Sequence, residues 1–466
     1  MFKCGKKRDY KKQKKIRTKS RALPMICAII FSAVVFNDAG AGAQNKISET
    51  AVEAIAYASD YYSAADYSTS APIVTTENTI TVKYKMFGNF KTGGYAYLSS
   101  FSYSDEFFAF DSSVFSPAIA RASIALAAAS YRNDPPGSYI RRAIIDMGYN
   151  IVVSRGYDIK DDEDGGMAAD VQDTVAYTIG RRLANISGKY RFIYCIVLRG
   201  TEGAGEWLSN IDTGVSSDAD HEGFRRTADA LLAEISKRIT TKAENNIIWI
   251  TGHSRGGAVA NLLGATITES QIFASRDNIY VYTFGSPNTT TKAGVYDNIY
   301  NIINPDDIIT VLPPERWGFH RFGDSIELSR DAAVYSKMKR NFYELTEGTE
   351  YTSLGGTEEF KQIVARWCPK PDDYYDKGVI GYSPYDIISI VLTDIQNALT
   401  KFSAAQLIQF SLYHNSGIKF VYYCYENYMA IACGHCYESY IAWINATWPD
   451  EGTISEVSES RGSIAA

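Results

Sequence analysis

The chain has 466 residues, of which 45% are hydrophobic and 21% are charged. These values are typical of a folded protein with a large core, and they exclude a collagen-like, coiled-coil or wholly disordered chain. Residues 1–43 contain 11 Lys and Arg against two Asp and Glu, so the remainder of the chain has a net charge of −15. An acidic body of this size repels a phosphate backbone, which argues against nucleic acid as a partner.

Residues 1–43 have the order of a secretory signal peptide. Lysine and arginine dominate up to Arg21, an apolar run extends over residues 24–36, and Ala41-Gly42-Ala43 supplies the small residues of a cleavage site. A helix as long as the apolar run spans about 20 Å, short of the roughly 30 Å hydrocarbon core of a bilayer. We predict cleavage near Ala43 and a secreted or extracytoplasmic protein. An uncleaved signal that anchors the chain in a membrane is the alternative.

The next part of the chain is predicted to be an N-terminal extension, residues 44–100, that is partly flexible. Alternation of polar and apolar residues predicts a strand at Thr79–Tyr84. Apolar residues at helical spacing predict a helix over Phe115–Tyr131, which a Pro- and Gly-containing turn ends. The acidic segment Asp158–Asp173 lacks the Asp spacing of a calcium loop and is predicted to be a solvated loop.

From Thr174 to Gly285 the pattern changes to strands that alternate with helices. Strands are predicted at Val175–Ile179, Tyr194–Leu198, Ile247–Thr251, Ile279–Phe284 and Ile299–Ile303, and helices at Glu222–Ile239 and Gly256–Glu269. Buried apolar strands joined by helices of this length predict parallel crossover units. We therefore expect an α/β fold with a central, mostly parallel sheet and helices on both faces.

The chain becomes mostly helical after residue 330, with amphipathic stretches at Ala332–Leu345 and Ala404–His414. We expect a core domain over residues 101–330 and a mainly helical insert, or lid, over residues 331–430. Residues 431–466 form the C-terminal segment.

The strongest local motif is Gly252-His253-Ser254-Arg255-Gly256-Gly257, between a predicted strand and a predicted helix. Glycines at a sharp strand-to-helix turn allow the Ser254 hydroxyl to project over the edge of the sheet. We interpret the motif as a nucleophile elbow. Serine is a weak nucleophile, so a base and an oriented acid are needed elsewhere in the chain.

With this elbow, the sequence resembles the class 3 (fungal-type) lipase family of the α/β-hydrolase fold. Four further segments match the family's motifs in order: Arg199-Gly200-Thr201, His221-Glu222-Gly223-Phe224, Phe284-Gly285-Ser286-Pro287, and residues 304–309 with residues 312–314. The resemblance covers about residues 107–323. It implies a serine hydrolase that cleaves carboxylic esters of lipids.

The resemblance also implies roles for individual residues. The oxyanion hole would use the backbone N–H groups of Thr201 and Arg255. Matching the acid-bearing segment selects Asp307 over its neighbour Asp306. The order nucleophile, acid, base then requires a histidine beyond residue 307.

Three histidines satisfy that order, namely His320, His414 and His435. The stretch from His435 to Trp443 resembles the ending of bacterial lipase-like relatives, with Tyr437 where a proline is common, so His435 is the favoured base. His414 on an apolar helix is the main alternative. His253 and His221 are interpreted as structural residues.

The predicted reaction is two-step hydrolysis through an acyl-serine, with a Ser254-Asp307-His435 triad and with no metal or cofactor. An imidazole with an ordinary pKa of about 6.5 can take the serine proton and return it to the leaving group. Phospholipids are included among the expected substrates, together with contact with a lipid interface. No obligatory protein partner is evident. A thioesterase or another acyl-transferring hydrolase, and a non-catalytic surface-binding protein, remain alternatives.

Five cysteines follow the signal segment, namely Cys195, Cys368, Cys424, Cys433 and Cys436. A bridge that involves Cys433 or Cys436 would fix the loop around His435, whereas two free buried thiols are the competing interpretation.

Overall fold

The computed structural model describes residues 62–63, 79–90, 96–132, 135–157, 175–200, 219–292, 294–367, 423 and 426–449. The expected signal peptide, the acidic segment Asp158–Asp173 and the helix Ala404–His414 lie outside the described residues. None of the helices within the described ranges combines the length and the apolar character that a membrane span requires.

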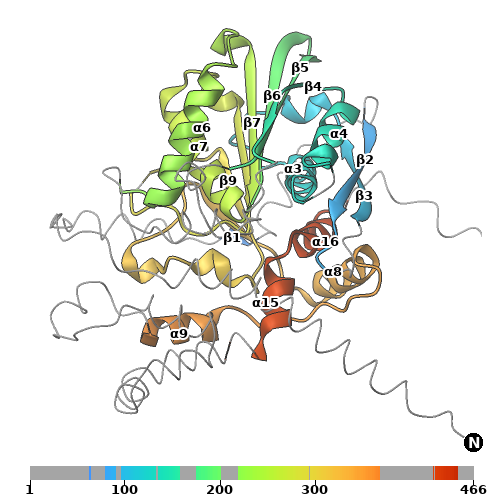
Figure 1. The fold of residues 1–466 in the computed structure, drawn as a ribbon, viewed down its shortest axis with the longest axis vertical. Helices are drawn as coiled ribbons and strands as arrows, with labels where there is room; N and C mark the ends of the chain where they lie inside the picture. The colour runs from blue at the N-terminus through green and yellow to red at the C-terminus, as the bar shows by residue number, and fades with distance from the viewer. Residues whose placement is uncertain are drawn as a thin grey trace, which may run out of the picture.

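A mixed sheet forms the centre of the described structure (Figure 1). In spatial order its strands are β1 (Tyr62–Ser63), β10 (Asp324–Glu327), β9 (Ile299–Ile303), β8 (Ile279–Phe284), β7 (Asn246–His253), β6 (Lys189–Leu198), β5 (Tyr177–Ile186) and β4 (Asn150–Arg155). The pairs from β1 to β6 are parallel, and β5 is antiparallel to both β6 and β4. The expectation of a mostly parallel sheet is therefore confirmed.

Strands β5 and β6 differ from the sequence prediction. Both are longer than expected and they form one antiparallel hairpin, with Tyr177 opposite Leu198, in place of a parallel crossover unit. Ser187 and Gly188 make the turn with positive φ values of 48° and 82°, as tight hairpin turns require. The outer halves of both strands are partly exposed and carry Arg and Lys, so the apolar pattern marked only their buried ends.

Helices cover both faces of the sheet. Helices α6 (Glu222–Ser236) and α7 (Arg255–Ser270) pack on one face, and α3 (Pro117–Ala129) and α4 (Ser138–Asp146) lie on the other (Figure 1). Alternate residues of a strand point to opposite faces, so Ile248 packs under α7 while Trp249 packs on the side of α3. This arrangement confirms the expected α/β-hydrolase fold.

A two-stranded antiparallel hairpin, β2 (Ile80–Phe87) and β3 (Ala96–Tyr103), packs against α3 and α4. Its inward-facing residues, such as Val82 and Phe101, belong to the same apolar cluster as α3. Much of the expected N-terminal extension after residue 79 thus joins the core.

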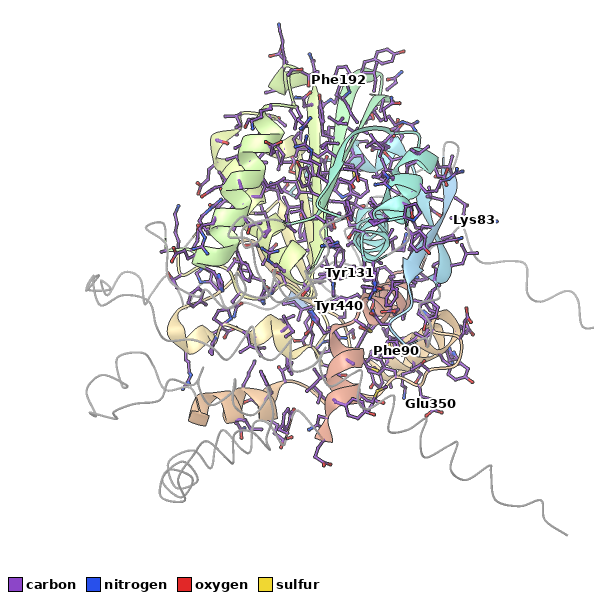
Figure 2. The ribbon with its side chains drawn as sticks, in the orientation of Figure 1. Lys83, Phe90, Tyr131, Phe192, Glu350 and Tyr440 are labelled. Carbon is purple, nitrogen blue, oxygen red and sulfur yellow. The ribbon has the colours of Figure 1, made fainter. Side chains whose placement is uncertain are left out.

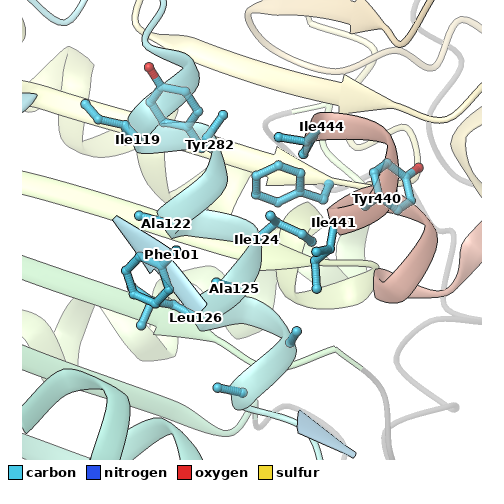
Figure 3. Close-up of a cluster of buried hydrophobic side chains, with 14 of the residues drawn as sticks. Phe101, Ile119, Ala122, Ile124, Ala125, Leu126, Tyr282, Tyr440, Ile441 and Ile444 are labelled. Atoms are coloured by element: carbon cyan, nitrogen blue, oxygen red, sulfur yellow. The ribbon is translucent and has the colours of Figure 1, made fainter. Parts of the chain in front are cut away.

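Among the described residues after the sheet, the structure has the helices α8 (Ala332–Leu345), α9 (Glu358–Trp367), α15 (Tyr428–His435) and α16 (Tyr437–Thr447). Helix α16 packs between α8 and α3. Figure 3 shows Ile441 and Ile444 of α16 beside Ile124 of α3 in the buried apolar cluster. Helix α8, which falls in the range expected for the helical insert, is therefore packed onto the core.

Short 3-10 helices lie in the connections: η3 (Asp105–Phe108), η5 (Ala243–Asn245), η6 (Arg276–Asn278), η7 (Ile308–Val311) and η8 (Glu315–Trp317). The carboxyl ends of β6, β7, β8 and β9 meet at one edge of the sheet, because these strands are parallel. This edge carries the predicted site.

Candidate active site

Ser254 stands between β7 and α7 in a conformation that few non-glycine residues adopt. Its φ and ψ angles are 58° and −130°, and its backbone N–H donates to the Phe284 carbonyl over 2.9 Å. The turn leaves no space for side chains on its flanks. A Cβ on Gly252 would lie 2.3 Å from the Gly256 oxygen, and one on Gly256 would lie 2.5 Å from the Leu198 oxygen. The strained serine and its tight flanks have the geometry of a nucleophile elbow.

His435 connects Ser254 with Asp307 through two hydrogen bonds. Its Nε2 lies 2.9 Å from Ser254 Oγ, and its Nδ1 lies 2.8 Å from Asp307 Oδ2. A carboxylate only accepts, so Nδ1–H donates to Asp307 and Nε2 accepts from the serine hydroxyl. His435 is 7% exposed and Asp307 is fully buried, so water competes little for these bonds.

Asp307 is held by donors other than the histidine. Its Oδ1 accepts the Ile309 backbone N–H over 2.9 Å, and its Oδ2 accepts the Tyr440 hydroxyl over 2.8 Å. Burial and the Asp307 carboxylate raise the pKa of Tyr440 well above its ordinary value, so the hydroxyl keeps its proton and donates. Tyr440 was not among the predicted site residues, although it lies in the stretch from His435 to Trp443 that pointed to the base.

Asp306 is equally buried but does not contact the histidine. Its carboxylate binds Arg330, the Tyr351 hydroxyl over 2.9 Å, the Ser353 hydroxyl over 2.7 Å and the Gly356 N–H over 2.9 Å. These partners lie between β10 and α9. The structure thus separates the two adjacent carboxylates, and only Asp307 is placed beside His435.

The other histidines have different surroundings. His320 Nε2 lies 3.1 Å from the Lys292 carbonyl, and the backbone of His320 pairs with Thr290, so it is not beside Ser254. His221 caps α6, where its Nδ1 lies 3.5 Å from the Phe224 N–H. His414 lies outside the described residues.

His253 precedes the serine and is fully enclosed. Its Nε2 lies 2.8 Å from the His435 carbonyl and its Nδ1 lies 2.7 Å from the Tyr131 hydroxyl. Burial and the neighbouring His435 lower the pKa of His253 well below its ordinary value. Figure 2 shows Tyr131 and Tyr440 near the strand ends beside α15 and α16. No sequence motif pointed to Tyr131.

Of the two expected oxyanion donors, Arg255 is the first residue of α7. Its backbone N–H therefore lies at the positive end of the helix dipole. Its side chain is buried and donates to Thr227 Oγ1 over 3.1 Å. Thr201 lies outside the described residues, whereas Arg199 and Gly200 before it follow directly after β6.

Glu438 is a buried carboxyl close to the histidine in sequence. Its two oxygens accept the Asn89 backbone N–H over 3.0 Å and the Asn89 Nδ2 over 2.8 Å, which ties α16 to the β2–β3 hairpin. Burial raises the pKa of Glu438 to about 7. This residue was not predicted, because a glutamate in an apolar stretch gives no sequence signal of its partner.

Cys195, Cys433 and Cys436 are buried free thiols. Burial raises the pKa of Cys433 to about 11 and that of Cys436 well above its ordinary value. The structure therefore has no bridge between Cys433 and Cys436, and Cys368 and Cys424 lie outside the described residues. Across the described ranges, no cluster of three or more His, Cys, Asp or Glu side chains is arranged to hold a metal ion.

Residues 195–317 match the model of the family "Lipase (class 3)". A lipase from Rhizomucor miehei is 25% identical over 146 residues, which are 28% of this chain and 40% of that lipase. The chain thus spans less than half the length of this relative. The relative is fungal, so it supports the resemblance to class 3 lipases but not the bacterial kinship expected from residues 435–443.

Solved structures give the same kind of match. A crystal structure of a lipase from Rhizopus microsporus var. chinensis is 18% identical, covers 46% of this chain and 74% of its own, and has a TM-score of 0.33. A triacylglycerol lipase whose catalytic centre is described as a serine protease triad is 19% identical, covers 46% and 80%, and has a TM-score of 0.31. Over residues 195–317, which include Ser254 and Asp307, the chain is similar to the class 3 lipases.

Proposed function

We propose that this protein is a serine hydrolase of the lipase type, which cleaves carboxylic esters of lipids. One observation carries the proposal: a continuous hydrogen-bond chain from Ser254 through His435 to buried Asp307, with the serine on a strained elbow. The similarity of residues 195–317 to class 3 lipases supports the substrate class.

The geometry supports acyl transfer through the serine. Ser254 Oγ attacks the ester carbonyl carbon while its proton passes to His435 Nε2. When the tetrahedral intermediate collapses, the bond to the alcohol oxygen breaks and His435 returns the proton to that oxygen. Water then attacks the acyl-serine with His435 as base; the bond to Ser254 Oγ breaks, His435 returns the proton to Oγ, and the carboxylic acid is released. Asp307 holds the ring in the required tautomer and stabilises the imidazolium.

The negative oxygen of the intermediate needs fixed donors. We assign the backbone N–H groups of Arg255 and Thr201 to this role. The assignment is supported by the position of Arg255 at the first residue of α7 and by the sequence position of Thr201, which follows the last residue of β6, Leu198, in the matched motif.

Further proposals concern location, substrate and domain organisation. Residues 1–43 direct secretion, as their basic, apolar and small-residue order indicates. Phospholipids are included among the lipid esters, and the protein acts at a lipid interface. Residues 331–430 form the helical insert before the base, of which α8 is packed on α16.

The test uses the full chain, Ser254→Ala and a matched control, Ser270→Ala, at the exposed far end of α7. A fluorophosphonate probe should form an adduct at Ser254 in the wild type and the control but not in Ser254→Ala. Hydrolysis of p-nitrophenyl esters should follow the same pattern. Absence of both adduct and hydrolysis in the folded wild type would favour the non-catalytic alternative.

A second arm defines the substrate class. Triglycerides, phospholipids and matched oxygen esters and thioesters of several acyl lengths are compared by kcat/KM. The proposal expects lipid oxygen esters to be preferred at least tenfold over thioesters. A preference for thioesters would replace the lipase assignment with a thioesterase.

A further inference from the structure

The candidate base is the last residue of a helix. His435 ends α15 (Tyr428–His435), and Cys436 directly caps both α15 and the following α16. The last four carbonyls of a helix have no partner inside that helix. Because this helix end is buried, those carbonyls need donors from elsewhere in the protein.

All four carbonyls have such donors. The Ala432 carbonyl accepts the Cys436 N–H over 3.1 Å, and the Cys433 carbonyl accepts the Cys436 thiol over 3.4 Å. The last two carbonyls accept from distant side chains. The Gly434 carbonyl accepts from Asn304 Nδ2 over 2.8 Å, and the His435 carbonyl accepts from His253 Nε2 over 2.8 Å. His253 immediately precedes Ser254, and Asn304 lies three residues before Asp307. The helix that carries the base is thus capped from the nucleophile loop and from the acid loop.

The hydrogen-bond partners of His253 determine its tautomer. A carbonyl oxygen only accepts, so Nε2 of His253 carries the proton and donates to His435. A neutral ring then has an acceptor at Nδ1, which receives the Tyr131 hydroxyl. The rings of Tyr131, Tyr437, Tyr440 and His435 surround His253 with centroid distances from 4.9 to 6.0 Å. Burial among them lowers the pKa of His253, which keeps the neutral, donating form.

The orientation of the Asn304 side-chain amide follows from its hydrogen bonds in the same way. Its Oδ1 accepts the Asp306 backbone N–H over 2.9 Å, so its amide nitrogen is the group that faces the Gly434 carbonyl. Its own backbone N–H donates to the Tyr440 hydroxyl over 3.1 Å, and Tyr440 donates to Asp307. Asn304 therefore contacts both the end of α15 and the donor that holds the acid.

We propose that His253 and Asn304 are positioning residues that cap the end of α15 and thereby hold the His435 ring in register with Ser254 and Asp307. Neither touches the reacting atoms. The catalytic consequence of the cap rests on the proposed function, whereas the cap itself is a structural property that is measured separately below.

The first experiment compares His253→Gln with His253→Leu in the full chain. The Gln Nε2 lies about as far from the backbone as the His Nε2 and keeps a donor for the His435 carbonyl, whereas Leu has none. Displacement of a reacting group by about 1 Å costs up to about 100-fold in rate. We expect His253→Leu to lower kcat 10- to 100-fold with KM within twofold of the wild type, and His253→Gln to recover kcat to within about fivefold.

His320→Gln is the matched control, because His320 also binds a backbone carbonyl through Nε2 but lies away from the triad. This variant should have kcat and KM within twofold of the wild-type values. Equal losses in His253→Gln and His253→Leu, or no loss in His253→Leu, would overturn the proposal.

The second experiment addresses Asn304. Asn304→Asp keeps an Oδ1 acceptor for Asp306 but replaces the donor to Gly434 with an oxygen. We expect kcat to fall 10- to 100-fold, and we expect the double variant with His253→Leu to lose less than the product of the two single losses, because both changes release the same helix end. If the loss of kcat in the double variant equals the product of the two single losses, the two residues do not act on one cap.

A spectroscopic readout does not depend on activity. The chain has five histidines, so selective ¹⁵N-histidine labelling gives few resonances, and His253→Gln identifies the signal of His253. We expect a neutral Nε2–H tautomer that does not titrate between pH 5 and 8. An Nδ1–H tautomer, or titration in this range, would contradict the cap. A wild type that shows the expected tautomer but hydrolyses no ester would refute the proposed function and leave the cap intact.

Discussion

Asp306 and Asp307 are adjacent in the chain and fully buried, yet their carboxylates bind different parts of the protein. Asp307 binds His435 and Tyr440, while Asp306 binds Arg330 and residues 351–356. One carboxylate therefore serves the candidate triad, and the other fastens the segment between α8 and α9 to the same loop.

This division predicts opposite effects for two matched substitutions. Asp307→Asn should lower kcat by roughly 10³- to 10⁴-fold, because the amide favours the wrong tautomer of the histidine, with a smaller effect on stability. Asp306→Asn should keep kcat within about tenfold but lower the free energy of unfolding by about 1–3 kcal/mol, because buried donors lose a charged acceptor. Steady-state kinetics and urea unfolding of both variants check this. A larger loss of kcat in Asp306→Asn than in Asp307→Asn would reverse the assignment of the acid.

Tyr440→Phe removes a donor from the acid and an acceptor from the Asn304 N–H. A hydrogen bond to a charged group contributes about 1.5–3 kcal/mol, so we expect kcat/KM to fall about 10-fold or more. Tyr343→Phe on the exposed side of α8 is the control and should change neither activity nor stability. Unchanged kcat/KM in Tyr440→Phe would mean that the hydroxyl does not support Asp307.

Glu438 predicts a pH dependence of stability. Its pKa is about 7 in the folded protein against an ordinary value of 4.5, so the folded state binds the proton more tightly than the unfolded state. This contribution is fully present below about pH 4.5 and is lost as the pH rises through about 7. A shift of this size corresponds to a loss on the order of 3 kcal/mol.

Glu438→Gln keeps an acceptor for Asn89 and cannot ionise. We expect the variant and the wild type to have similar stability near pH 4.5, and the variant to become more stable by pH 8.5. Thermal melting across this range measures the difference, with exposed Glu344→Gln as the control. A difference between variant and wild type that does not change with pH would contradict the raised pKa.

The thiols near His435 predict insensitivity to reduction. Cys433 and Cys436 are free, buried and poorly ionised, so native protein at pH 8 should resist iodoacetamide at both positions. Dithiothreitol should leave the rate of ester hydrolysis within twofold. Mass spectrometry of alkylated peptides, with denatured protein as the fully labelled control, measures this. Loss of activity on reduction would instead favour a bridge in solution.

Elements whose sequence signal is local were predicted correctly. The bounds of β8, β9 and α8 agree with the predicted ranges, because an apolar run or a helical period marks both ends of each element. The strand-to-helix turn at Ser254 lies where the motif indicates for the same reason, since its glycines and its strand are contiguous in sequence, while its role as a nucleophile elbow stays a prediction.

The parts that escaped prediction depend on contacts between distant residues. The Tyr131 hydroxyl meets His253 across 122 residues, and His253 meets the His435 carbonyl across 182. Neither Tyr131 nor His253 lies in a sequence pattern that identifies its hydrogen-bond partner. The pairing of β5 with β6 escaped as well, because their exposed halves do not alternate clearly.

The separation of the triad along the chain has a consequence for the growing polypeptide. His435 follows Asp307 by 128 residues, and ribosomes add about 5–20 residues per second, so the base emerges about 6–26 s after the acid. During that interval the elbow has no proton acceptor and α16 has not yet covered α3. On the proposed function, the Ser254–His435–Asp307 arrangement therefore forms only after α15 and α16 have been made and docked, which delays ester cleavage until residues 428–447 have left the ribosome.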